Sequence, residues 1–264
     1  MDDVNKFRMI EYRTDKEVAI ITLNQPETLN ALSVELEQEL IQAFRGCKED
    51  SQIRAVILTG AGRAFCSGGD INKMEKGVDV IEGKFWAELA GQIVEGIVNL
   101  PKPVIAAVNG PAVGGGMNLA LVCDMVIASE KAFFSESFAV VGLTPDTGGH
   151  FILPRLVGYR KALELIFTAE RVDAKKALKI GLINKVVPAD QLMDEAFSLA
   201  KKLAQGPTQA FGLSKAIMMK AFSSNMRDIL ELEAFGLGLA FSSEDHKEGV
   251  KAFREKRTPV FKGR

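Results

Sequence analysis

The stretch PVIAAVNGPAVGGGMNLALVCD, residues 103–124, decides the fold and says most about function. Its apolar run Val104–Val108 ends at Asn109-Gly110, which is typical of a buried strand that stops in a tight turn. Three glycines, Gly114–Gly116, then open the apolar pattern of a buried helix. Glycines at a helix start let a ligand approach unpaired backbone N–H groups, so the turn suits a phosphate or an oxyanion. Tight packing of the turn against the strand explains the same glycines equally well.

Strand and helix signals alternate on both sides of this stretch. Further buried strands are predicted at Val18–Leu23, Arg54–Thr59 and Met125–Ala128. Ser33 is suited to cap a helix that follows the first of these strands, and apolar residues recur on one face of another helix, at Phe85–Ile97. This order predicts an α/β fold with a largely buried sheet.

The pattern changes after about residue 190. No strand signal returns, and helices are predicted at Gln209–Phe222 and Arg227–Ser242. Within the second helix, Leu230–Phe241 is apolar on more than one face, which suits burial against another subunit. We therefore predict a core at residues 1–190 that carries the functional site, and a helical C-terminal region at residues 191–264.

The composition narrows the class of protein. The 264 residues carry a net charge of −1, which gives no general attraction to nucleic acid or to an anionic membrane. The N-terminus MDDVNKFRMI lacks the apolar core of a secretory signal, and polar residues and glycines interrupt the most apolar region. Three cysteines and two histidines, without metal-binding spacing, predict reduced thiols, no metal site and a cytoplasmic protein.

A second glycine-bearing loop, AGRAFCSGGD at residues 61–70, follows another predicted strand. Neither this loop nor Gly114–Gly116 has the Walker pattern or the spaced-glycine dinucleotide pattern. Two backbone amides that converge from separate loops suit a single oxygen atom, as an oxyanion hole requires. Such a hole stabilises a tetrahedral adduct or an enolate. Because the chain offers no convincing Ser–His–acid set, we favour the enolate.

The same loops belong to a wider resemblance. The chain resembles the crotonase, or enoyl-CoA hydratase/isomerase, superfamily almost from end to end. The matching segments, all in one order, are Ile21–Pro26, Leu29–Leu32, Ala64–Ile71, Ile105–Gly116, Gly142–Pro145, Gly148-Gly149, Leu153–Gly158, Ser243–Asp245, Glu248-Gly249 and Ala252-Phe253. The resemblance implies a crotonase-type spiral of strand–strand–helix turns with a C-terminal helical trimerisation region. It also implies assembly as a homotrimer or a dimer of trimers.

The resemblance further implies a CoA-thioester substrate, with the coenzyme entering as part of that substrate and no separate cofactor. The two amides that hold the thioester oxygen in the family correspond to those of Ser67 and Gly115. The other implied substrate-binding residues are Ala64, Cys66, Gly68, Asp70, Ile71, Gly114, Asn118, Phe138, Lys215, Phe253 and Lys256. For the last three, plain surface and packing roles are the alternative.

The chain departs from the family's hydratases at two positions. Those enzymes place and activate water with two glutamates, and the corresponding positions here hold Asn118 and Phe138. An amide and a phenyl ring do not exchange protons near neutral pH, so the usual hydratase mechanism is disfavoured.

A different carboxylate, Asp146, occupies a position that family isomerases use as acid/base. The segment Pro145–Gly149 is also good turn chemistry, which is the structural alternative for this aspartate. In an apolar pocket near Phe138, the pKa of Asp146 is expected to rise. Glu136 shares the face of Phe138 if this segment is a strand; it is a candidate second acid, although we expect a solvated or packing role. His150, beside the turn, is expected to be a buried structural histidine.

A single carboxylate is sufficient for double-bond or ring isomerisation. Asp146 removes a proton, the charge of the dienolate rests on the thioester oxygen between the two amides, and the same acid returns the proton at another carbon. Two alternatives stay open. One is a hydratase or dehydratase of an unusual acyl-CoA that uses Glu136, and the other is a non-catalytic CoA-thioester binder. The sequence does not decide the acyl group or the pathway.

Overall fold

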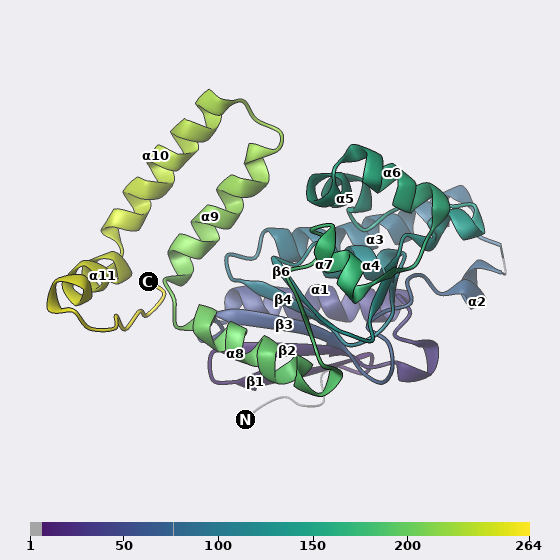
Figure 1. Cartoon of the computed structure of the whole chain (residues 1–264), viewed down its shortest axis with the longest axis horizontal. Helices are drawn as coiled ribbons and strands as arrows, with labels where there is room; N and C mark the ends of the chain where they lie inside the picture. The colour runs from purple at the N-terminus through teal and green to yellow at the C-terminus, as the bar shows by residue number, and fades with distance from the viewer. Residues whose placement is uncertain (1–6, 76) are drawn as a thin grey trace.

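A six-stranded sheet forms the centre of the molecule, in a computed structural model that describes residues 7–75 and 77–264 (Figure 1). The first six residues, on which the signal-sequence prediction partly rests, lie outside the described residues. The strands, in spatial order, are β1 (Ile10–Asp15), β2 (Val18–Leu23), β3 (Ala55–Gly60), β4 (Val104–Val108), β6 (Met125–Ser129) and β9 (Lys185–Val187). The first pair is antiparallel and the others are parallel. The predicted α/β class and buried strands are confirmed, the strands to within one residue.

Helices and a smaller sheet surround this centre. The smaller sheet holds β5 (Ala112–Val113), β7 (Phe133–Ser135) and β8 (Val172–Asp173). The α-helices are α1 (Val34–Glu49), α2 (Ile71–Met74), α3 (Val80–Val98), α4 (Gly115–Leu121), α5 (Gly149–Val157), α6 (Tyr159–Thr168), α7 (Ala174–Lys179), α8 (Leu192–Ala204), α9 (Thr208–Ala221), α10 (Met226–Ser242) and α11 (Glu244–Glu255). Short 3₁₀ turns are η1 (Pro26–Thr28), η2 (Ser137–Val141) and η3 (Ala189–Gln191). Ser33 caps α1 as predicted, by accepting a hydrogen bond from the Leu36 N–H.

The central strands are buried on both faces. Successive residues point to opposite sides of a sheet, so Ile57 and Ile105 pack with α8 on one face. Leu58 and Ala106 belong to the larger core on the other face, which α1, α3 and α4 complete. A sheet covered on both sides by helices needs apolar residues at every position, and this explains the uninterrupted run at Val104–Val108.

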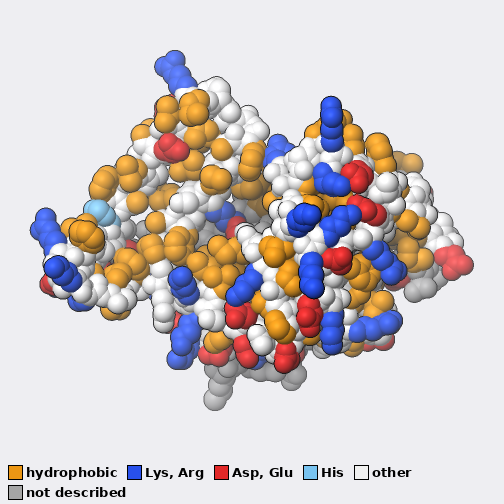
Figure 2. All heavy atoms as spheres, viewed as in Figure 1, with side chains coloured by type: hydrophobic (Ala, Val, Ile, Leu, Met, Phe, Trp, Pro, Cys, Tyr) orange, Lys and Arg blue, Asp and Glu red, His pale blue; other side chains and the backbone are white. Residues whose placement is uncertain are grey.

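The C-terminal helices leave the core after α8. Because α8 packs on the sheet, the packing places the boundary after this helix rather than at residue 190. Figure 1 shows α9 and α10 extending from the core as an antiparallel pair, with their connecting turn at the tip and α11 after α10 near the C-terminus. The side chains of Leu230, Phe235 and Leu239 on α10 are exposed in the single chain, and Figure 2 shows apolar side chains along this arm. Across the described residues, no helix is both long and apolar enough to cross a membrane.

Arg54, immediately before β3, fixes where this arm begins. Its guanidinium donates hydrogen bonds to the carbonyl oxygen of Gly206 (2.5 Å) and to the hydroxyl of Thr208 (3.0 Å), at the junction of α8 and α9. It also donates to the carbonyl oxygen of Phe261 in the C-terminal tail (2.8 Å). One side chain therefore joins the sheet, the start of α9 and the tail.

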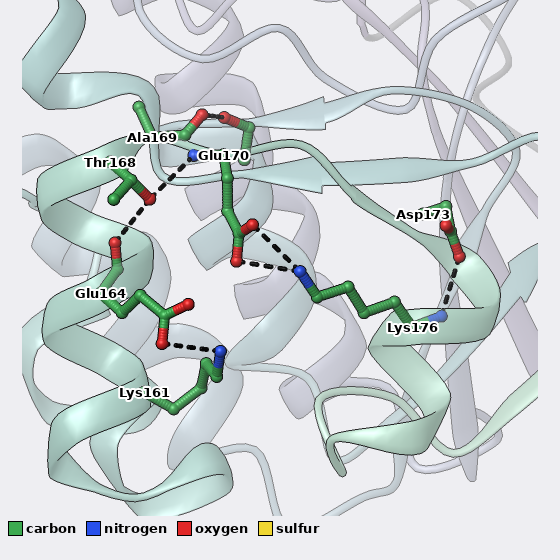
Figure 3. Close-up of polar contacts among 8 residues, drawn as sticks. Lys161, Glu164, Thr168, Ala169, Glu170, Asp173 and Lys176 are labelled. Carbon is green, nitrogen blue, oxygen red and sulfur yellow. Dashed lines mark hydrogen bonds and ion pairs between the residues drawn. The ribbon is translucent and has the colours of Figure 1, made fainter.

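A polar corner supports the segment that follows β7. The Ser135 hydroxyl donates to the carbonyl oxygen of Ala169, just after α6, over 2.8 Å. Figure 3 shows the neighbouring contacts, in which the Lys176 ammonium donates to both carboxylate oxygens of Glu170 (3.0 and 3.1 Å). Asp173 accepts from the Lys176 main-chain N–H and so caps α7. Exposed ion pairs of this kind add little stability one by one, and their role here is to fix the corner.

Candidate active site

The two glycine-bearing loops singled out in the sequence lie against each other. The Cys66 N–H donates to the carbonyl oxygen of Pro111 (3.1 Å), and the Val113 N–H donates to that of Cys66 (3.0 Å). Gly68 has a φ of +87°, and a Cβ on it would lie 2.7 Å from the Val113 carbonyl oxygen and 3.4 Å from the Gly115 nitrogen. Only glycine allows this approach of main chain to main chain. The loops after β3 and β4 thus form one site.

Ser67 does not offer a free amide. Its N–H donates to the carbonyl oxygen of Leu29 (3.0 Å), and its hydroxyl donates to that of Thr28 (3.1 Å). The prediction that the Ser67 amide holds a substrate oxygen is therefore wrong, because this donor is already used. Within residues 7–75 and 77–264, the N–H groups of Gly69 and Gly115 donate to no protein acceptor. These two amides are the available donors.

The carboxyl of Asp146 lies beside Gly115. A Cβ on Gly115 would lie 3.4 Å from Asp146 Oδ1, 3.2 Å from Thr147 Oγ1 and 3.0 Å from Leu32 Cδ1. The Thr147 hydroxyl donates to Asp146 Oδ1 over 2.8 Å. Thr147 has a φ of +49°, which is a strained conformation for a β-branched residue and is typical of functional sites. The turn therefore holds the Asp146 carboxyl above the Gly115 amide.

The surroundings of Asp146 alter its proton affinity. The side chain is exposed in the single chain, yet enough protein packs around the carboxyl to desolvate it, and this raises its pKa. The hydrogen bond from Thr147 and the charge of His150 oppose the rise. The direction is the one predicted from the sequence. The Phe138 ring lies beside Gly114, because a Cβ on Gly114 would lie 3.7 Å from it.

Asn118 and Glu136 form a buried polar pair behind this carboxyl. Asn118 is fully buried, and its Nδ2 donates to the main-chain oxygen of Asp146 over 3.0 Å. Glu136 is 1% exposed, and burial raises its pKa to about 8; the Asn118 side chain opposes this rise and the Asp146 charge adds to it. Of the two roles expected for Glu136, solvated or packing, the solvated one is therefore wrong. Since β7 ends at Ser135, the strand alternation with Phe138 does not apply either.

Sequence reasoning missed a third carboxyl, that of Glu37. It lies on the buried side of α1, is 5% exposed, and has its pKa raised to about 8 by burial and then by the Asp146 charge. The signal was present, because Leu40, Ile41 and Phe44 follow Glu37 by three, four and seven residues. A carboxyl within this apolar stripe of a helix must face the interior.

His150 is exposed, so its expected role as a buried structural histidine is wrong. Its Nε2 lies 3.2 Å from the Thr144 hydroxyl, a local contact at the rim of the turn.

Two residues of the first loop support it from within. The side chains of Ala64 and Cys66 are fully buried. The Ala64 carbonyl oxygen accepts from the side-chain amides of Asn30 (2.9 Å) and Asn109 (3.1 Å). Any substrate contact of Ala64 or Cys66 would therefore be through main-chain atoms, and the role of these two residues in substrate binding stays a prediction. Asp70 immediately precedes α2, where its carbonyl oxygen accepts from the Lys73 and Met74 N–H groups, and Ile71 is the first residue of α2 with an exposed side chain.

Lys215 is engaged within the protein. Its ammonium donates to Asp124 Oδ2 (2.7 Å) and to the carbonyl oxygen of Ile97 (2.8 Å). Lys215 thus joins α9 to the core, and its predicted nucleotide contact stays a prediction. Phe253 and Lys256 are exposed on and just after α11, which in Figure 1 lies far from α4 within one chain. A role for these two in binding the coenzyme stays a prediction.

Comparisons with known proteins agree with this geometry. The family model of enoyl-CoA hydratase/isomerase matches residues 13–264. The chain belongs to this family, and it is an enzyme of the crotonase superfamily.

Some of the individual relatives are named as hydratases and others as isomerases. The chain is 41% identical to a short-chain-enoyl-CoA hydratase of Clostridium acetobutylicum, over 91% of this chain and 92% of the relative. It is 39% identical to a 1,2-epoxyphenylacetyl-CoA isomerase of Escherichia coli, over 95% and 97%. A solved enoyl-CoA hydratase from Bacillus anthracis superposes with a TM-score of 0.93 at 36% identity, over 97% of this chain and all of that one. The predicted crotonase-type fold is confirmed.

Proposed function

We propose that the protein isomerises a CoA thioester, with Asp146 moving a proton between two carbons of the acyl group. One observation carries this proposal: Asp146 Oδ1 lies 3.4 Å from the place of a Cβ on Gly115, next to an unused amide. The positions of the hydratase glutamates hold Asn118 and Phe138, which transfer no protons. The 39% identity to a 1,2-epoxyphenylacetyl-CoA isomerase supports this choice.

The reaction needs one base and one place for negative charge. The ionised Asp146 carboxylate takes a proton from a carbon of the acyl group, and the electron pair of that C–H bond enters conjugation with the thioester. The negative charge then rests on the thioester oxygen, which accepts hydrogen bonds from the Gly69 and Gly115 amides. Asp146 returns the proton to another carbon, so the double bond has moved, the carboxylate is restored and no water is consumed.

The pKa values of the three carboxyl groups near this site favour a single negative charge, on Asp146. Burial raises the pKa of both Glu37 and Glu136 to about 8, so both are mainly neutral near pH 7. Asp146 is less completely surrounded and keeps its negative charge more easily. Its raised pKa makes it a stronger base than an ordinary aspartate. The site thus offers one carboxylate to the substrate rather than a repelling cluster.

Turnover of purified protein tests the proposal. We expect interconversion of 3-enoyl- and 2-enoyl-CoA, or rearrangement of a ring-epoxide thioester, followed by chromatography and mass spectrometry. Asp146→Asn should lose at least about 10³-fold in kcat, because it removes the proton carrier. The exposed Asp190→Asn, on η3, is the matched control and should keep full activity. Full activity in Asp146→Asn would refute the role of this residue.

The hydratase alternative rests on the names of many relatives, including the short-chain-enoyl-CoA hydratase. Incorporation of oxygen from labelled water into the product would favour it over isomerisation. A non-catalytic binder would instead be stabilised against heat by acyl-CoA thioesters without turning any of them over.

The proposed assembly is a homotrimer or a dimer of trimers, supported by the exposed apolar side chains of α10. A molar mass from light scattering tests it. The three cysteines are free and buried, which supports the proposed reducing, cytoplasmic location. We propose no cofactor beyond the coenzyme A of the substrate.

A further inference from the structure

The first loop of the site is held by a side chain that lies outside it, that of Asn30. This residue follows η1, is fully buried and has a φ of +58°, which asparagine tolerates better than most residues. Its Nδ2 donates to the carbonyl oxygens of Ala61 (3.0 Å), Ala64 (2.9 Å) and Phe65 (3.1 Å). Its Oδ1 accepts from the Gln25 N–H over 2.9 Å. One amide group therefore fixes the main chain of the loop at three points.

The Asn30 amide has one possible orientation and no room to leave it. Three of its partners are acceptors and the fourth is a donor, so a flipped amide would oppose like groups at every contact. A Cβ on Gly60, the last residue of β3, would lie 2.8 Å from Asn30 Nδ2, so the amide packs directly on the end of the strand. Replacing the amide therefore removes all four hydrogen bonds together.

The main chain on both sides of Asn30 continues these contacts to the end of the loop. The residue before it accepts from the Ser67 N–H over 3.0 Å, and the Leu32 N–H donates to the Gly68 carbonyl oxygen over 2.8 Å. The Gly68 carbonyl and the Gly69 N–H belong to one trans peptide unit, in which they point in opposite directions. The bond from Leu32 therefore turns the Gly69 N–H away from this segment, which leaves it available to a substrate oxygen.

We propose that Asn30 is a positioning residue that sets the Gly69 amide for the enolate oxygen. Asn30 acts through the main chain of the loop, since its side chain is fully buried and both of its polar atoms bond to main-chain partners. A hydrogen bond to an enolate oxygen is stronger than one to a neutral thioester, so a displaced amide weakens the enolate more than the bound substrate. The inference rests on the proposed function, through its enolate step alone.

Kinetics of Asn30 variants test the proposal. Asn30→Gly removes the side-chain bonds and keeps a residue that adopts a positive φ freely, so kcat should fall about 10- to 100-fold while KM changes less than about threefold. Asn30→Ala should lose kcat by a similar factor and unfold at a lower temperature than Asn30→Gly, because alanine is disfavoured at this φ. The matched control is Asn99→Gly, at an exposed position that ends α3, and it should keep both constants. Should Asn30→Gly fail to fold, Asn30→Ser supplies the same comparison.

Binding measurements give a readout that does not depend on turnover. A 3-ketoacyl-CoA loses its acidic C2 proton to the solvent and forms an enolate that absorbs in the near ultraviolet, whereas a saturated acyl-CoA of equal length forms none. In an absorbance titration, Asn30→Gly should bind the enolate about 10- to 100-fold more weakly than the wild type does. In a calorimetric titration, it should bind the saturated thioester within about threefold of the wild type. A role of Asn30 in stability alone would change both affinities by one factor or change neither.

The positioning role and the isomerase function fail on different results. Equal losses for the two ligands, or unchanged kcat and enolate absorbance in Asn30→Gly, would overturn the positioning role even if the enzyme is an isomerase. No enolate absorbance in the wild type would overturn it as well. If the wild type turns over no enoyl-CoA but binds the enolate, and Asn30→Gly loses that binding alone, the isomerase function fails and the positioning role holds.

Discussion

Replacing Lys215 by methionine tests whether this lysine holds the fold or the coenzyme. The Lys215 and Asp124 side chains are 12% and 24% exposed, and their ion pair is 2.7 Å long. Asp124 Oδ2 also accepts from the Val104 N–H, so it lies at the start of β4. Desolvation raises the pKa of Asp124 and the lysine opposes this rise. Lys215→Met therefore leaves a half-buried carboxylate without its cation.

The expected loss is about 2–3 kcal/mol of unfolding free energy. A fully buried pair that loses one partner costs about 3–5 kcal/mol, and partial exposure of this pair reduces that value. For a chain of this size the midpoint of thermal unfolding should fall by about 4–6 °C. Asp124→Asn should cost less than Lys215→Met, because the neutral amide still reaches both donors. The affinity for CoA thioesters should stay within about twofold in both variants.

Calorimetry at fixed protein concentration gives the stability, and titration of a CoA thioester gives the affinity. Lys201→Met on α8 is the matched control, since its side chain is exposed and it should change neither quantity. An unchanged unfolding midpoint together with a tenfold weaker affinity for Lys215→Met would refute the structural role. That result would instead support the nucleotide contact that the family resemblance implies.

Three further predictions concern the site. Gly115→Ala should lower kcat about 10- to 100-fold in steady-state assays, because its Cβ would lie 3.0 Å from Leu32 Cδ1 and 3.4 Å from Asp146 Oδ1. Unchanged turnover would argue against a tight fit of the thioester oxygen beside the Gly115 amide. Ser67→Ala should keep its activity, since that hydroxyl bonds only to a loop carbonyl, and a hundredfold loss would contradict this. Urea unfolding should show that stability falls between about pH 4.5 and pH 8, where the unfolded chain has lost a proton that the buried Glu37 keeps. Glu37→Gln should remove part of this loss of unfolding free energy with rising pH. The same pH dependence in Glu37→Gln and wild type would refute the raised pKa of Glu37.

The sequence predicted the elements that local pattern alone determines. Val104–Val108 and Val18–Leu23 are recovered with their bounds, because a strand buried on both faces must be apolar along its length. The two glycine loops were also recognised, since close main-chain packing requires glycine. Glu37 was missed although its helical period placed it inside.

The errors arose where a distant segment decides the role of a residue. Whether the Ser67 amide is free depends on Leu29, which reaches it from the loop after β2. The contact of Lys215 with Asp124, 91 positions away, was not foreseen for the same reason. Glu136 was misjudged because the chain leaves the strand at Ser135 and enters a 3₁₀ turn, which alters the face on which a side chain emerges.

Arg54 gives the chain an order of events during folding. Its guanidinium meets the α8–α9 junction and the C-terminal tail only once β3 has joined the sheet. Until then, the start of α9 lacks this anchor, and of the polar contacts described above only those of Lys215 with Asp124 and Ile97 tie α9 to the core. In the proposed assembly, docking of subunits through this arm would therefore follow formation of the sheet. If the proposed assembly forms, we expect refolding to divide into an early step independent of protein concentration and a later bimolecular step, with the contacts of Arg54 completed before the second.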